Sequence, residues 1–175
     1  FFFHAHPAIP DAQESRGLGD VYKRQAVRVH ADYTVTSGPQ RAKDTLGEHE
    51  FNDIMANGGR VAQVNVWRPI TGPVESSPLA LASATSIPAY DLVATDQRFP
   101  DRVGEIYQLA FGEGHEWYYA PDMMPNEVIL IKGWDSLGDG RAQFTPHGAF
   151  EHPSETPKSK PRESIESRTY LVFKG

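Results

Sequence analysis

Apolar and polar residues alternate along several short segments of the chain, and this pattern predicts a protein built mainly of strands. In residues 26–35 (AVRVHADYTV), Val29 and Ala31 alternate with His30 and Asp32. A period of two residues is that of a β-strand, whose successive side chains point to opposite faces. His30 and Asp32 are therefore expected to lie on one face of a strand.

After residue 35, one helix is predicted first, and the rest of the chain is then predicted to form further strands. A helix is predicted from Ser37-Gly38-Pro39 to about Ala56, ending at Asn57-Gly58-Gly59. Further strands or extended segments are predicted at 60–68, 79–84, 90–94, 102–111, 117–119, 126–132 and 165–173. Many short strands with turn signals between them predict a mainly β fold, a double-stranded β-helix (jelly roll) with at least one helix.

The first 25 residues do not fit this organisation. The hexamer DVYKRQ at 20–25 reads like a translated sequencing adapter, the alternative being a natural polar loop. The apolar start has no basic region and is a poor signal peptide. We therefore expect 1–25 to be a non-native or disordered segment, which removes His4 and His6 as candidate ligands, and 26–175 to be a partial domain.

Composition narrows the chemistry that the chain can perform. It has no cysteine, so disulfides, thiolate metal sites and cysteine nucleophiles are excluded. A metal must then be held by His, Asp or Glu, which favours iron, manganese or zinc. A net charge of −6 without a basic stripe argues against nucleic acid, and apolar runs such as 128–131 are too short to span a bilayer. We expect a cytoplasmic protein with neither nucleic acid nor membrane as a partner.

The candidate chemistry lies in the pair His30 and Asp32. A distant histidine added to such a pair makes the facial triad of two histidines and one carboxylate that holds Fe(II) and leaves positions open for a keto acid and O₂. Taken alone, the pair also fits a solvent-facing strand edge. His147 follows a buried strand and a loop, and is the expected third ligand.

Three other histidines compete with His147 for this role. His49 lies in a polar helical segment, where a solvated ring is expected. His115 lies in a turn rich in Gly and Glu and is also expected to be solvated. His152 precedes a proline in the predicted loop 153–161.

A bound 2-oxoglutarate also needs a cation for its far carboxylate, and a guanidinium fits that group bidentately. Arg168 opens the last predicted strand, and its position favours it. Arg162 with Ser164 forms an Arg-x-Ser pattern and is the alternative. Residues 162, 164 and 168 share one face of an extended strand, so both arginines can line one pocket. A surface arginine is the other interpretation of each.

Five segments in order resemble consecutive blocks of the AsaB-like hydroxylase/desaturase family, which includes gibberellin desaturase relatives and CmcJ-type proteins. They are RVHADYTVTSGPQRAKD, VNVWRPITGPVESSPLAL, HEWYYAPDMMPNEVILIKGWDS, DGRAQFTPHGAF and PRESIESRTYLVF. The resemblance covers Arg28 to Phe173. Within these blocks, Asn65 and Trp67 are expected either at the barrel mouth or, for Trp67, in the core.

The resemblance implies an Fe(II)/2-oxoglutarate-dependent oxidoreductase. Such an enzyme uses O₂ to hydroxylate or desaturate a small, secondary-metabolite-like substrate, with no catalytic side chain beyond the metal centre. On this interpretation residues 26–175 are a partial oxygenase jelly-roll domain. Two rival functions remain, a cupin-like binding module without redox activity and a metal-dependent hydrolase that uses the same ligands. The substrate and the choice between hydroxylation and desaturation stay open.

Overall fold

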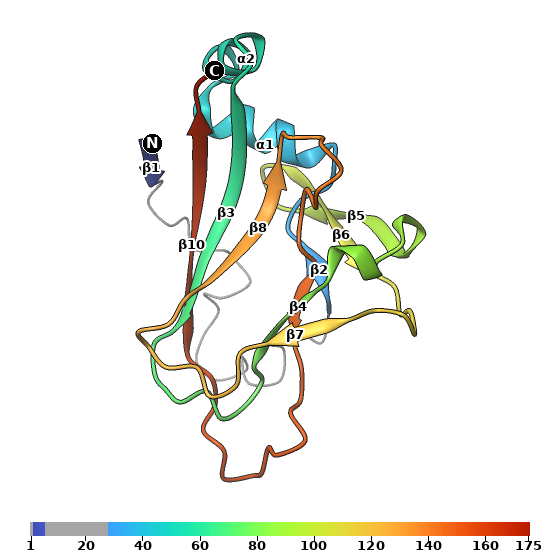
Figure 1. The fold of residues 1–175 in the computed structure, drawn as a ribbon, viewed down its shortest axis with the longest axis vertical. Coiled ribbons are helices and arrows are strands. Elements are labelled where there is room, and N and C mark those ends of the chain that lie inside the picture. The colour runs from blue at the N-terminus through green and yellow to red at the C-terminus, as the bar shows by residue number, and fades with distance from the viewer. Residues whose placement is uncertain (1, 6–27) are drawn as a thin grey trace.

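The structure is a computed structural model that describes residues 2–5 and 28–175 (Figure 1). Its strands form two antiparallel sheets. The first has the order β1 (Phe2–Ala5), β10 (Ser164–Phe173), β3 (Arg60–Pro69) and β8 (Ile129–Asp135). The second has the order β5 (Leu92–Arg98), β6 (Val103–Leu109), β2 (His30–Ala31), β9 (His147–Ala149), β4 (Leu79–Ala82) and β7 (Trp117–Tyr119). The predicted mainly β jelly roll is confirmed.

The predicted single helix is two helices in the structure, and that prediction was wrong in this respect. α1 (Ser37–Leu46) and α2 (Glu48–Ala56) meet at Gly47. Gly47 has φ 91°, which lies outside the α region and which glycine adopts without steric cost. Both helices lie at the end of the first sheet where β3 begins and β10 ends (Figure 1).

The strand predicted at 26–35 is much shorter where it is described, because β2 covers His30–Ala31 alone. The hydroxyl of Thr34 accepts hydrogen bonds from the backbone N–H groups of Thr36 and Ser37. These bonds turn the chain into α1 and so end the strand. Two other boundaries also differ: β8 starts later than the predicted 126–132, and β5 extends beyond the predicted 90–94 to Arg98.

The buried apolar side chains form two separate clusters. The first packs α1 and α2 against the sheet, and it contains Tyr33, Ala42, Phe51, Ile54, Val61, Trp134, Tyr170 and Val172. The second lies inside the barrel, and it contains Trp67, Val74, Leu79, Met123 and Ile131, with Leu81 against it. Trp67 is therefore a core residue, and each such aromatic ring contributes roughly 1.5–3 kcal/mol by burial.

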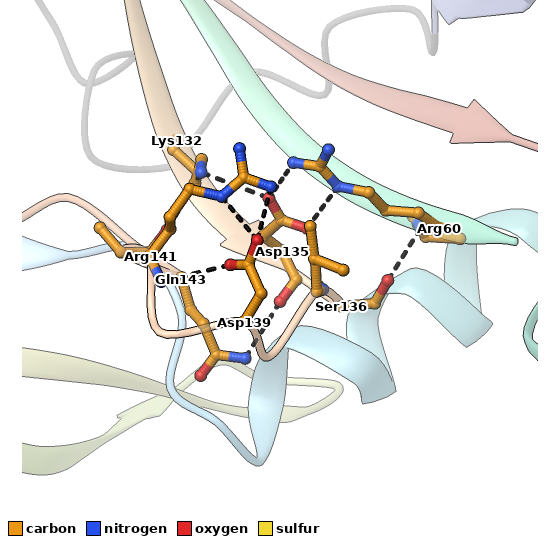
Figure 2. Close-up of polar contacts among 10 residues, drawn as sticks. Arg60, Lys132, Asp135, Ser136, Asp139, Arg141 and Gln143 are labelled. Atoms are coloured by element: carbon orange, nitrogen blue, oxygen red, sulfur yellow. Dashed lines mark hydrogen bonds and ion pairs between the residues drawn. The ribbon is translucent and has the colours of Figure 1, made fainter. Parts of the chain in front are cut away.

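A charged cluster at the end of β8 holds the loop that leads to β9 (Figure 2). The carboxylate of Asp135 is almost fully buried and accepts a hydrogen bond from Arg60 Nε at 2.9 Å. Lys132 Nζ lies 3.3 Å from the same carboxylate and donates to the carbonyl of Ala142 at 3.0 Å. The side chain of Gln143 donates to the backbone carbonyl of Asp135 at 3.3 Å. The cluster thus joins β3, β8 and the segment before His147.

The predicted non-native segment 1–25 includes four residues that the structure describes, Phe2–Ala5. Residues 6–25 lie outside the described residues, and Phe2–Ala5 form β1, which pairs with β10. That residues 1–25 are non-native stays a prediction. Among the described helices, none has the length and apolar character that crossing a membrane requires.

Asp135→Ala is predicted to lower the free energy of unfolding by about 1.5–3 kcal/mol, the contribution of hydrogen bonds to a charged group. Two cations would then lose their partner. Chemical denaturation measures the change. Asp139→Ala is the matched control, because its ion pair with Arg141 is exposed and such pairs contribute about 0–1 kcal/mol. Equal effects of the two substitutions would contradict the assignment.

Candidate metal centre

The structure brings the three predicted ligands together. His30 in β2 lies directly opposite His147 in β9, although 30 and 147 are far apart in sequence. Directly opposite residues in an antiparallel pair project their side chains to the same face of the sheet. Asp32 follows two positions after His30, and one ligand atom from each of the three residues lies within 4.8 Å of the others. Within the part of the chain that the structure describes, no other group of His, Asp or Glu does this.

Both imidazoles are oriented by backbone carbonyls. His30 Nδ1 donates to the carbonyl of Arg28 at 3.1 Å, and His147 Nδ1 donates to the carbonyl of Thr145 at 3.0 Å. Since a carbonyl only accepts, each ring carries its proton on Nδ1 when neutral. Each Nε2 is then left with its lone pair, the form that binds a metal. The ring centroids are 4.7 Å apart, with 52° between the planes.

Asp32 is a buried carboxylate held in its charged form. Its Oδ1 lies 3.6 Å from His30 Nε2 and 3.4 Å from the guanidinium of Arg168. Burial raises the pKa of Asp32, but the charge of Arg168 and the neighbouring His30 outweigh burial and hold this pKa well below its usual range. The site therefore presents an anionic ligand at neutral pH.

The two histidines differ in their surroundings. Burial lowers the pKa of His30, but the hydrogen bond to Asp32 and its charge outweigh this effect and raise the pKa above the ordinary value. Burial dominates at His147, so the pKa of His147 is lowered. His147 is therefore neutral near neutral pH. His30 takes up a proton more readily than an ordinary histidine, so a proton and a metal ion would compete for its ring.

Asp32 is also held from β3, by Asn65, which was expected at the barrel mouth without a contact to Asp32, and through Asn65 by two residues that were not predicted. Asn65 Nδ2 donates to Asp32 Oδ2 at 2.6 Å and to Glu166 Oε1 at 2.9 Å. Gln63 Nε2 donates to Asn65 Oδ1. One signal was available for Glu166, because it lies between Ser164 and Arg168 on the same face of β10. The contact of Asn65 with Asp32 depends on how the two sheets pack.

The two candidate arginines lie at different depths. Arg168 is paired with Asp32 and, through Nε, with Glu166 at 3.4 Å. The guanidinium of Arg162 lies 5.4 Å from the ring centroid of Trp67 and donates to the carbonyl of Ser77 at 2.5 Å. Ser164 is half-buried at the start of β10. Trp67 is a core residue, so Arg162 lies beside the core, whereas Arg168 lies beside Asp32 of the candidate triad.

The three competing histidines differ in how deeply they are buried. His49 is exposed, as expected. The expectation that His115 is solvated was wrong, because its side chain is only 5% exposed and its Nε2 lies 2.8 Å from Asp91 Oδ2. Gly112 permits this contact, since a Cβ there would lie 2.5 Å from the His115 ring. His152 is half-buried and hydrogen-bonded to the hydroxyl of Tyr119. None of the three contacts the triad.

A cavity of about 200 Å³ lies beside the loop that leads to His147, and its wall includes Leu92 and Phe144. In the pairing of β5 with β6, Val93 is opposite Gln108, which is itself opposite His30. Leu92 is one position away from Val93 and faces the other side of the sheet. The cavity is therefore on the face opposite to the candidate ligands.

The chain is similar to a family of known proteins. The family described as oxidoreductase/YMDC permease-like domain matches residues 5–173. The hydroxylase/desaturase asaB of Aspergillus flavus is 38% identical over 92% of this chain and 76% of its own. The Fe(II)/2-oxoglutarate-dependent dioxygenase nvfI of Aspergillus novofumigatus is 31% identical over 95% of this chain and 59% of its own. Among solved structures, the iron and alpha-ketoglutarate-dependent endoperoxidase NvfI matches with a TM-score of 0.76 and 28% identity, over 91% of this chain and 58% of that chain.

A jelly roll with two histidines and one carboxylate on one face defines the class of non-heme iron oxygenases. Within this class, the chain belongs to the AsaB-like hydroxylase/desaturase family, and the predicted resemblance is confirmed. The chain spans 76% of asaB but between 50% and 59% of the relatives efuI, aspirochlorine biosynthesis protein N, phiK and nvfI.

Asp32→Ala is predicted to abolish Fe(II) binding, because it removes the anionic ligand and leaves two imidazoles. His147→Ala should weaken binding strongly as well. Anaerobic titration with Fe(II) measures both effects. His49→Ala is the control, because His49 is exposed and distant from the triad. Unchanged Fe(II) affinity in Asp32→Ala would contradict the ligand assignment.

The affinity for Fe(II) is predicted to fall as the pH falls, beginning above the ordinary histidine value of about 6.5. The raised pKa of His30 means that protons compete with the metal for this ring first. Since the pKa of His147 is lowered, about one proton should be released on binding near neutral pH. Dissociation constants measured across this range test the sign. A release of two protons with onset well below 6.5 would contradict it.

Proposed function

We propose that this chain is the Fe(II)/2-oxoglutarate-dependent oxygenase domain of an enzyme that hydroxylates or desaturates a small, secondary-metabolite-like molecule with O₂. The observation that carries the proposal is the convergence of His30, Asp32 and His147 on one face of the second sheet. The names of the relatives agree with this class of reaction. Because the chain spans about half the length of most of these relatives, the activity and substrate of the whole enzyme belong to the proposal.

The donor set fits Fe(II). Two neutral imidazoles present Nε2, and a carboxylate kept charged by its neighbours presents Oδ1. When bound, Fe(II) supplies open coordination positions at which 2-oxoglutarate and O₂ react. The chain's own contribution is to fix the three ligands. Thr145 and Arg28 fix the rings through their carbonyls, and the Asp135 cluster holds the loop that delivers His147.

The far carboxylate of 2-oxoglutarate is proposed to meet Arg162 or Arg168. The two carboxylates of this molecule are separated by a keto carbon and two methylene groups. The guanidinium of Arg162 lies 5.4 Å from the ring centroid of Trp67, a core residue, which supports Arg162 as the cation for a carboxylate in the barrel. Arg168 lies on the same side of the barrel as the triad, but it contacts Asp32 directly. Its present contact supports a role in balancing the charge of Asp32.

Two rival functions lose support from the same observations. A cupin-like binding module needs no open metal triad, and a metal-dependent hydrolase has no use for a second cation in the barrel. The relatives named above are oxygenases. A cytoplasmic location and the lack of a nucleic-acid partner are part of the proposal and rest on composition and charge.

The test is the release of succinate from 2-oxoglutarate by the purified chain with Fe(II) and O₂. Succinate release is expected to require both Fe(II) and 2-oxoglutarate, and to be lost in Asp32→Ala. The assay reads the turnover of 2-oxoglutarate alone, so the organic substrate need not be known. If the chain binds Fe(II) with no 2-oxoglutarate-dependent succinate release, the oxygenase assignment is rejected in favour of a binding module.

Replacing the arginine that anchors 2-oxoglutarate with Ala is predicted to lower the affinity for 2-oxoglutarate, so that a higher concentration is needed for turnover. The affinity for Fe(II) should change little. A hydrogen-bonded carboxylate and guanidinium contribute about 1.5–3 kcal/mol, or roughly 10- to 150-fold in affinity. Arg162→Ala and Arg168→Ala are compared in the succinate assay and in Fe(II) titrations. Arg141→Ala is the control, because Arg141 is an exposed surface arginine paired with Asp139. An unchanged requirement in both variants would contradict the anchor assignment.

A further inference from the structure

We infer that Asn65 is a positioning residue that holds Asp32 to the metal through one oxygen only, Oδ1. This inference rests on the proposed metal centre. Its structural basis is a closed ring of contacts among four side chains: Asp32, Asn65, Glu166 and Arg168.

The two carboxylate oxygens of Asp32 have different partners. Oδ2 accepts the hydrogen bond from Asn65 at 2.6 Å. Oδ1 lies 3.6 Å from His30 Nε2 and 3.4 Å from the guanidinium of Arg168, which is a longer contact than that of Asn65 with Oδ2. Oδ1 therefore faces the other ligands. Oδ2 already uses a lone pair on a short hydrogen bond from a buried amide, so it has less capacity than Oδ1 to act as a second metal donor. The contact directs the metal to Oδ1.

The orientation of the Asn65 amide follows from its neighbours. The atom between Asp32 and Glu166 must be the NH₂ group, because an ionised carboxylate accepts hydrogen bonds and donates none. Each hydrogen of this group then has one carboxylate partner. The remaining atom, Oδ1, accepts from Gln63. Rotating the amide by half a turn would place its oxygen against two carboxylates and its NH₂ against another NH₂.

Burial makes this arrangement rigid. The Asn65 side chain is fully buried, and it comes from the middle of β3, which is paired on both sides by β10 and β8. Its backbone is thus fixed by two strands, and its side-chain groups are all engaged. Partners that orient a ligand in this way typically account for a 10- to 100-fold effect on metal affinity.

Holding Asp32 through one oxygen has a consequence for the reaction. With one donor atom from each of the three residues, a bound Fe(II) would keep positions open for the keto acid and for O₂. If Asp32 bound through both oxygens, it would occupy one of these positions. By holding Oδ2, Asn65 would keep that position available.

The experiment compares Co(II) binding by the intact chain and by Asn65→Leu, with visible absorption as the readout. Leu is close to Asn in size but offers no hydrogen bond. The substitution is expected to weaken Co(II) binding by about 10- to 100-fold and to change the intensity of the Co(II) bands, which depends on coordination number. Asn52→Leu is the matched control, because Asn52 is exposed on α2, and it should leave both readouts unchanged.

A structural effect is separated by circular dichroism and thermal unfolding of the metal-free variants. If Asn65→Leu does not fold, Asn65→Ser replaces it, since its hydroxyl is too short to reach Asp32 and the same loss is expected. Unchanged Co(II) affinity and an unchanged spectrum in a folded variant would overturn the inference. A parent chain that binds no Co(II) would instead reject the proposed function, and Asp32→Ala, run alongside, shows what that loss looks like.

Discussion

The candidate site depends on one strand pairing, that of β2 with β9. β2 is only two residues long, yet it is the strand that joins β6 to β9 in the second sheet. Its register places His30 opposite His147. A shift of one residue would turn His30 to the other face, because side chains alternate along a strand. The register is held from outside this pair, since Leu109 donates to the carbonyl of Val29 and the loop before β9 is fastened to β8.

The attachment of this loop to β8 affects both the stability of the fold and the position of His147. Lys132 uses both its ammonium and its backbone carbonyl on the segment before His147: the ammonium binds the carbonyl of Ala142, and the carbonyl accepts from the N–H of Thr145. Thr145 in turn accepts the Nδ1 proton of His147. The position and tautomer of the distal ligand therefore depend on the end of β8, where Asp135 gathers Arg60 and Lys132.

The sequence predicted the features that depend on local patterns. The two-residue alternation was sufficient to place His30 and Asp32 on one side, and the Gly and Pro signals marked most strand ends. The break at Gly47 was missed because both flanking segments have helical character and one glycine does not by itself decide a helix end. His115 was misjudged because its burial depends on Asp91, which lies 24 positions away and reaches it only through the fold. Asn65 was left open for a similar reason, since its contact with Asp32 joins residues of different sheets.

Three charged side chains lie along one face of β10 and of the segment just before it. Arg162 lies deep beside Trp67, Glu166 accepts from Asn65, and Arg168 contacts Oδ1 of Asp32. A metal ion and Arg168 both address Oδ1, whereas Asn65 addresses Oδ2 alone. A bound divalent ion and Arg168 would therefore compete for the negative charge of Oδ1. The contact of Arg168 Nε with Glu166 at 3.4 Å does not involve Asp32, so this contact does not depend on which of the two cations Oδ1 serves.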